Sequence, residues 1–112
     1  MDDAHEILDT INDEQSRSIL TLLSKSELNI QQISDTLKIP LSTAYRKVRK
    51  LDDLKLIKKT KVVRTIDGLD ESYYKNWIYE VIITYRDGVL SYKLEHVKIE
   101  DKIVRLWQKF SE

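Results

Sequence analysis

The 112-residue chain contains no cysteine, one proline and two glycines. Without cysteine it can form neither disulfides nor thiolate metal sites, which fits a reducing compartment. Residues that interrupt helices and strands are therefore few, and we see no linker, repeat or low-complexity segment. No apolar run approaches the roughly 20 residues that a membrane-spanning helix needs, and the acidic N-terminus lacks the pattern of a signal peptide. We therefore expect a single domain over residues 1–112, cytoplasmic and without a membrane partner.

Net charge is also absent, but the charged residues are unevenly distributed. The chain holds 19 basic and 19 acidic residues. Residues 38–64 hold ten basic and two acidic residues, a local charge of +8, whereas residues 1–37 carry −6 and residues 65–112 carry −2. A local excess of this size is typical of a surface that binds a polyanion. The alternative is a solvated helix face, which is what most charge runs are.

No group of residues suggests catalysis. The sequence has no Gly-rich phosphate loop, no cluster of metal ligands and no nucleophile paired with a base. Its two histidines, His5 and His96, lie in different expected elements. We therefore expect a protein that is not an enzyme and that uses no metal and no cofactor.

Apolar residues at helical spacing predict three helices in the first third of the chain. Asn12 with Gln15, and Asn29 with Gln32, resemble capping boxes, so the second and third helices are expected to begin at Asn12 and Asn29. The apolar stripes of the three helices are Ala4, Ile7, Leu8 and Ile11; then Ile19, Leu22 and Leu23; then Ile30, Ile33 and Leu37.

A fourth expected helix carries the positive charge as an organised stripe. Ala44, Val48 and Leu51 recur at helical spacing and define its buried side. Arg46 and Arg49 then point almost directly away from that side. The exposed face also takes in Ser42, Thr43, Tyr45 and Lys50, whereas Lys47 lies nearer the apolar side and has to extend its ammonium past it.

After residue 56 apolar residues recur at every second position, a spacing that predicts strands. A ribbon is expected over about 57–86, with a long loop containing Asp67-Gly68 between its strands. Asp87-Gly88 is a common two-residue hairpin turn, so an extra antiparallel strand is expected over 89–97. This turn pairs Arg86 with Val89, and an unbroken register continues from there to Tyr79 opposite His96.

The order of these elements resembles a winged helix-turn-helix. The stretch LNIQQISDTLKIPLSTAYRKVRKLDDLKLIKK, residues 28–59, is similar to the DNA-binding core of ArsR-like and MarR-like transcription regulators of archaea or bacteria. Two positions depart from the family: Lys55 replaces a common Gly or small residue, and Pro40 replaces a common cap. Metal-sensing relatives use Cys and His clusters that this chain lacks. The family pattern is occupied by Ser42-Thr43, Ala44, Tyr45, Arg46, Val48, Leu51 and Leu56-Ile57.

The resemblance implies an α+β fold, mostly α, with the helix-turn-helix at about 29–54. It implies a nucleoid-associated homodimer that binds double-stranded DNA through a recognition helix and a basic wing. The acidic surfaces at the two ends would then face away from the duplex. The implied recognition-helix residues are Ser42, Thr43, Tyr45, Arg46, Arg49 and Lys50, and the implied backbone contacts of the wing are Lys58, Lys59, Lys61 and Arg64.

Apolar residues on the two terminal helices have two interpretations. A last helix is expected over about 99–111. The two stripes either cover the domain's own core or form the dimerisation surface, and we favour a dimer because terminal helices serve this role in many relatives. The interface would comprise Ile7, Ile11, Ile103, Leu106, Trp107 and Phe110.

A second function from a different class fits the same residues. Some winged helices act as protein-interaction modules within transcription, replication or chromosome complexes, without a specific DNA site of their own. In that case the basic stripe would serve solubility or contact a protein partner.

Overall fold

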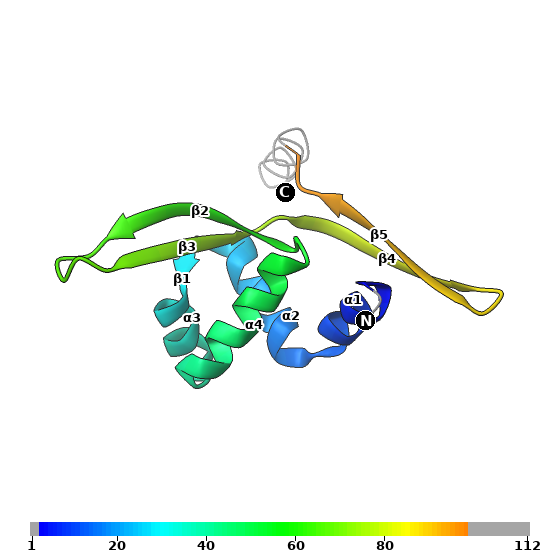
Figure 1. The fold of residues 1–112 in the computed structure, drawn as a ribbon, viewed down its shortest axis with the longest axis horizontal. Helices are drawn as coiled ribbons and strands as arrows, with labels where there is room; N and C mark the ends of the chain where they lie inside the picture. The colour runs from blue at the N-terminus through cyan, green and yellow to red at the C-terminus, as the bar shows by residue number, and fades with distance from the viewer. Residues whose placement is uncertain (1–2, 99–112) are drawn as a thin grey trace, which may run out of the picture.

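Four helices lie beneath two β-hairpins in the computed structural model, which describes residues 3–98 (Figure 1). This is the expected α+β architecture. No helix in the described part of the chain is long and apolar enough to cross a membrane. The expected helix at 99–111 lies outside the described residues. The elements are α1 (Asp3–Asn12), α2 (Glu14–Lys25), β1 (Leu28–Asn29), α3 (Ile30–Leu37), α4 (Leu41–Asp53), β2 (Ile57–Arg64), β3 (Asp70–Asn76), β4 (Ile78–Arg86) and β5 (Val89–His96).

The two expected helix starts have different outcomes. The capping box at α3 is confirmed: the Asn29 side chain accepts from the Gln32 N–H at 2.8 Å, and the Gln32 side chain accepts from the Asn29 N–H at 2.9 Å. The box expected at Asn12 is wrong, because α1 continues through Asn12. Asp13 is the N-cap of α2 instead, and its carboxylate accepts from the Ser16 N–H at 3.0 Å. A carboxylate is as good an N-cap as an amide, so either residue could have started the helix.

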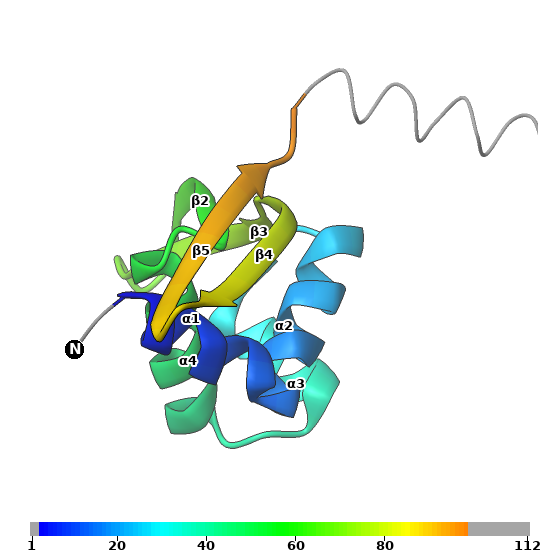
Figure 2. The same ribbon diagram turned by 90° about the vertical axis from the view of Figure 1, so that its right-hand side faces the viewer.

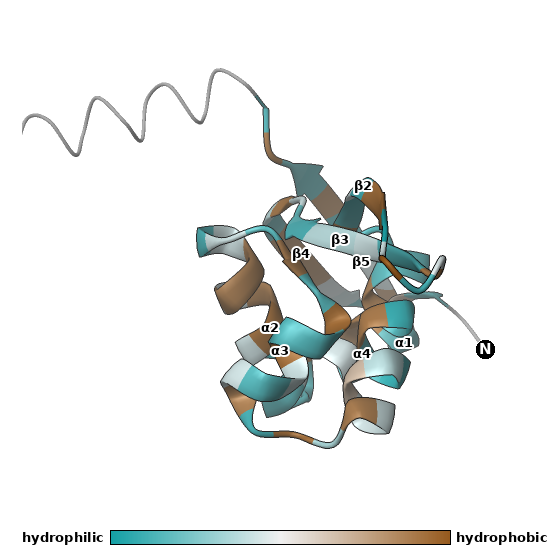
Figure 3. Cartoon of the chain, turned by 90° about the vertical axis from the view of Figure 1, so that its left-hand side faces the viewer, coloured by the Kyte–Doolittle hydropathy of each residue, from teal (hydrophilic) through white to brown (hydrophobic). Residues whose placement is uncertain are grey.

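The core lies where the four helices meet the base of the sheets. Ala44, Val48 and Leu51 of α4 are fully buried, which confirms the apolar side expected for this helix. Each helix is apolar on one side and polar on the other, as the brown and teal bands of Figure 3 show. The other buried members of the cluster are Ile7, Ile19, Leu23, Ile33, Leu56, Ile57 and Tyr74.

The wing is shorter than expected and has a different return strand. Its sheet has the order β1-β3-β2, all antiparallel, with Lys59 opposite Tyr74. The ribbon expected over 57–86 therefore ends at Asn76, and the loop at its tip spans only 65–69. Strand β3 was missed because residues 70–76 contain no aliphatic side chain, and only Tyr74 among them is buried. The pairing with β1 and β2 holds these polar residues in a strand.

Strands β4 and β5 form a separate two-stranded hairpin. The predicted pairs Arg86 with Val89 and Tyr85 with Leu90 are present. The register shifts near the base, where Ile78, not Tyr79, lies opposite His96. The strand expected as an addition to the wing thus pairs only with β4. The hairpin crosses over α1 and projects beyond it, opposite to the wing (Figures 1 and 2).

A single residue, Trp77, joins the two hairpins. Its N–H donates to the carbonyl of Leu56 at 3.1 Å, and its carbonyl accepts from the N–H of Val97 at 2.8 Å. Its ring stacks on His96 with the ring centroids 3.9 Å apart, and the His96 Nε2 lies 3.0 Å from the carbonyl oxygen of Lys55. The junction is therefore held by backbone bonds on both sides and by one aromatic stack.

Lys55 adopts a left-handed conformation between α4 and β2. Its φ is 64°, in the region that favours glycine. This accounts for the small residue or Gly that is common at this place in winged helices. Here a side chain with a Cβ occupies the position at a steric cost.

Replacing Lys55 should reveal that cost. We expect Lys55→Gly to raise the free energy of unfolding by about 0.5–1 kcal/mol relative to Lys55→Ala, which removes the same charge but keeps the Cβ. Urea unfolding of the two variants measures the difference. Equal stabilities would show that the backbone at this position is not strained.

Candidate nucleic-acid interface

Helix α4 is oriented by its buried side and by the turn that precedes it. In that turn Lys38 is left-handed, with a φ of 56°, and Ser34 donates its hydroxyl to the carbonyl of Ile39 at 2.7 Å. Pro40 caps the helix without a side-chain hydrogen bond. The first N–H groups of α4 therefore have no side-chain acceptor at the cap position.

The expected recognition face is exposed. Tyr45 is 58% exposed, Ser42, Arg46 and Arg49 are also exposed, and Thr43 is half-buried. Arg46 and Arg49 form no ion pair with any residue of the described chain. Two cations are thus held outward by a fully buried side of the same helix and remain available to an anion.

Two lysines of the same helix are paired within the chain. The Lys50 ammonium lies 3.1 Å from Glu6 of α1, and the Lys47 ammonium lies 2.6 Å from Asp13. A groove between α4 and the first two helices is lined on the α4 side by cations and on the other by carboxylates, among them Arg46, Lys47, Arg49, Lys50, Asp9 and Asp13. The acidic N-terminal region, expected to face away from a duplex, partly flanks the basic helix instead. The sequence showed both charged regions but not that folding brings them together.

The basic residues of the wing lie on two different faces. Cross-strand partners share a face of a sheet, and Tyr74 marks the face that is turned to the helices. Lys59 lies opposite Tyr74, whereas Lys58 and Lys61 lie opposite Lys75 and Tyr73 on the other face. On that other face the Lys58 ammonium lies 5.6 Å from the Trp77 ring and the Lys61 ammonium 4.7 Å from the Tyr73 ring.

The remaining wing cation is Arg64, next to the tip loop. Its guanidinium Nε lies 3.8 Å from the Asp70 carboxylate, and the side chain is 77% exposed. Register places it on the face of Tyr74, with Lys59. Of the four wing cations expected to contact DNA, Lys59 and Arg64 therefore lie on the face turned to the helices. Lys58 and Lys61 lie on the opposite face.

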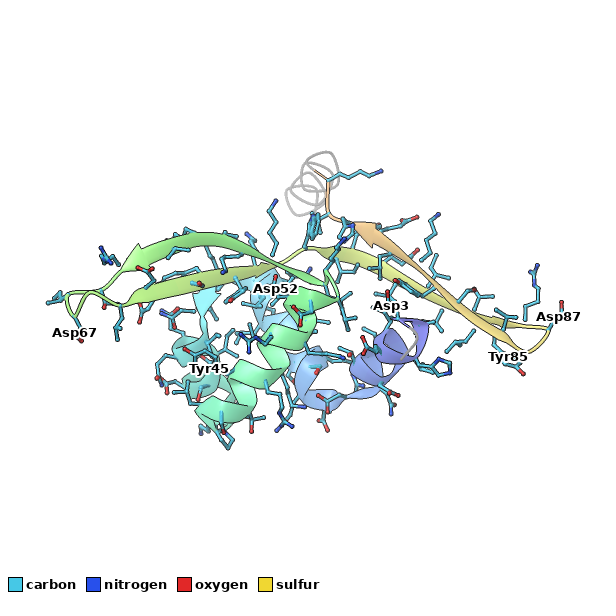
Figure 4. The ribbon with its side chains drawn as sticks, in the orientation of Figure 1. Asp3, Tyr45, Asp52, Asp67, Tyr85 and Asp87 are labelled. Carbon is cyan, nitrogen blue, oxygen red and sulfur yellow. The ribbon has the colours of Figure 1, made fainter. Side chains whose placement is uncertain are left out.

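Carboxylates line the space between the wing and α4. A cleft of about 480 Å³ separates β3 and the tip loop from the start of α3 and α4. Tyr45 lies on its helical side, and Asp67, Asp70 and Glu71 lie on its wing side. Figure 4 shows Asp67 at the far end of the wing. These carboxylates disfavour a phosphate within the cleft, whereas the outward side of α4 carries exposed cations.

The residues expected at a dimer interface are placed in part. Ile7 is 1% exposed and belongs to the core, and Ile11 packs against that core. Of the two interpretations of this stripe, burial in the domain's own core therefore applies to Ile7, which has almost no exposed surface with which to contact a partner. Ile103, Leu106, Trp107 and Phe110 lie outside the described residues.

Comparison with known proteins supports the fold alone. No protein-family model matches the sequence, and no curated protein gave a match. Among solved structures, HlyU from Vibrio cholerae, a winged-helix transcription regulator, superposes with a TM-score of 0.54 at 15% sequence identity. The match covers 96% of this chain and 90% of that one. The chain therefore has a winged-helix fold.

Asp13 connects the candidate interface to the helical core. Its Oδ2 accepts from the Lys47 ammonium at 2.6 Å and from the N–H and hydroxyl of Ser16 at 3.0 and 2.7 Å. These bonds, first the one from Lys47 and then those from Ser16, lower the pKa of the Asp13 carboxyl from 3.8 to about 2. A carboxyl whose pKa is lower in the folded state stabilises the fold above its unfolded pKa, and this is lost as the pH falls through about 2.

Asp13→Asn keeps a good N-cap but removes the charge. We expect it to lower the free energy of unfolding by about 1 kcal/mol near neutral pH, since the side chain is partly exposed and the pair is screened. The difference from the native chain should shrink as the pH falls below 4 and continue to decline through pH 2, as measured by urea unfolding across that range. Asp9→Asn, which removes a carboxylate without an ion pair in the described chain, is the control. A difference that stays constant down to pH 2 would contradict the assignment.

Proposed function

We propose that this chain is a transcription regulator of the ArsR-like or MarR-like type that binds a specific double-stranded DNA site as a homodimer. The observation that supports it is the pair Arg46 and Arg49, exposed and unpaired on the outward side of α4. In a winged helix this element is the one that fits the major groove. The protein acts by binding and not by catalysis, in the cytoplasm at the nucleoid.

The roles of the helix residues follow from their chemistry. Arg46, directly opposite the buried side, is placed to donate two hydrogen bonds to a guanine edge. Tyr45, on the flank nearest the wing, can contact a thymine methyl or a phosphate. Ser42 and Thr43 in the first turn can bind a phosphate together with the uncapped N–H groups. Arg49, one turn further along, is assigned to the phosphate backbone.

The wing contributes less than its composition suggests. Arg64 and Lys59 lie on the face turned to the helices and are the wing cations assigned to the DNA backbone. Lys58 and Lys61 lie on the other face over aromatic rings, and we assign them to packing at the base of the wing. Lys50 contributes only when a phosphate replaces Glu6, an exchange that costs little because exposed pairs contribute about 0–1 kcal/mol.

Substitution of the two free arginines tests the assignment. A site is first selected from random duplexes, and binding is then measured over a salt series. Arg46→Ala should weaken the selected site by about 1–3 kcal/mol and relax the base preference. Arg49→Gln should weaken all duplexes alike and reduce the slope of log K against log salt by about 0.9 per protomer.

Lys25→Gln is the matched control, because Lys25 is an exposed cation at the far end of α2. It should change neither base preference nor the salt slope. A native protein whose binding to duplexes shows no salt dependence, or that selects no sequence, would favour the protein-interaction module instead.

The carboxylates of α1 and the α2 cap should limit non-specific binding. Glu6→Gln releases Lys50, so we expect tighter binding to random duplexes and a salt slope steeper by about 0.9 per protomer. Glu14→Gln also removes one exposed carboxylate but frees no lysine, so its slope should equal that of the native chain. Equal slopes for Glu6→Gln and the native chain would show that Lys50 does not reach phosphate.

A further inference from the structure

The hairpin of β4 and β5 has an outer edge that no strand of residues 3–98 covers. The two strands pair only with each other. Helix α1 contacts β5, and Val81 and Ile83 of β4 pack against the core, so the helices support one face of the hairpin and leave the outer edge of β4 without a strand. A strand edge with free N–H and C=O groups is a template for another strand.

The register identifies which residues present those groups. Arg86 and Val89 flank the two-residue turn and form a hydrogen-bonded pair. Alternation along the strand then directs the N–H and C=O of the even-numbered residues of β4 toward β5. Those of Val81, Ile83 and Tyr85 point to the outer edge. The regular part of β4, beyond the irregularity at its base, runs from Glu80 to Arg86 and has Ile83 at its centre.

Charge along this edge is complementary to itself. Glu80 and Arg86 are exposed, on one face, and make no ion pair within the described chain. When β4 is placed antiparallel to a second β4 about Ile83, each Glu80 faces an Arg86 of the other copy, twice by symmetry. Shifting the pairing by two residues removes both charge pairs. Charge therefore selects one register among those that the backbone allows.

Apolar exposure on the other face favours the same register. Tyr85 is 75% exposed near the tip of the hairpin (Figure 4). In the register centred on Ile83 it faces Val81 of the second copy, an aromatic and β-branched pair of the kind that stabilises sheets. On the face of Glu80 and Arg86, the same register places Ile82, which is 41% exposed, opposite Thr84.

We infer that two copies of this chain associate through β4, forming a continuous four-stranded sheet in the order β5-β4-β4-β5 with its two-fold axis at Ile83. This deepens the homodimer of the proposed function, and the self-association does not require DNA. It assigns the contact to the hairpin, in place of the part of α1 that the core already buries.

A charge-swap experiment on the full chain without DNA tests the inference. The native protein should form dimers at micromolar concentration by sedimentation equilibrium. Glu80→Lys places one lysine opposite Arg86 in each half of the pairing, and Arg86→Glu places one glutamate opposite Glu80. Each should weaken dimerisation by about tenfold or more. The double variant Glu80→Lys with Arg86→Glu restores opposite charges and should restore the dimer.

Glu14→Lys on α2 is the control, because it reverses the charge of an exposed carboxylate that lies outside the hairpin. It should leave dimerisation unchanged. A monomeric native protein, single variants that dimerise normally, or a double variant that stays monomeric would each overturn the inference. The first result would also remove the homodimer of the proposed function, whereas DNA binding by α4 keeps its own test. The second and third results would remove only the contact through β4, and failure of DNA binding would leave the dimer measurement intact.

Discussion

The burial of one side of α4 determines most of what this molecule can do. Ala44, Val48 and Leu51 have no exposed surface, and because a helix is rigid, fixing them fixes the direction of every other side chain along it. Arg46 and Arg49 are directed outward as a result, and Lys47 is directed toward α2. The same burial sets where the chain leaves the helix, and so where the wing begins.

The electrostatic character of the surface depends on which charges have partners more than on how many there are. Residues 38–64 carry +8 by count, yet Lys47 and Lys50 are paired with carboxylates of the N-terminal region. The wing places carboxylates beside the start of α4 as well. The positive surface is therefore narrow and centred on two arginines. A narrow positive surface favours recognition of one arrangement of phosphates over general attraction to any polyanion.

Local patterns in the sequence predicted the described helices, the capping box at Asn29 and the turn at Asp87-Gly88. They also predicted the apolar sides of the helices, apart from Leu8, which is 41% exposed. All of these depend on residues close together in the chain. Strand β3 escaped because its residues are polar and its conformation is imposed by two neighbouring strands. The partners of Lys47 and Lys50 escaped because they are 34 and 44 positions away in the sequence, and no local pattern contains such a distance. The division of the wing cations between two faces depends on a register irregularity between Lys59 and Lys61 that composition does not reveal.

The junction at Trp77 has a mechanical consequence. Strands β3 and β4 follow one another with Trp77 alone between them, so the wing and the hairpin of β4 and β5 are joined at that residue. Its backbone bonds to Leu56 and Val97 attach it to the segment that follows α4 and to the residue that follows β5. A displacement of the wing therefore reaches the opposite hairpin through this residue as well as through the helical core, against which both hairpins pack. The stack of Trp77 on His96 lies at this junction, so a change in the angle between the two hairpins would alter the surroundings of this indole.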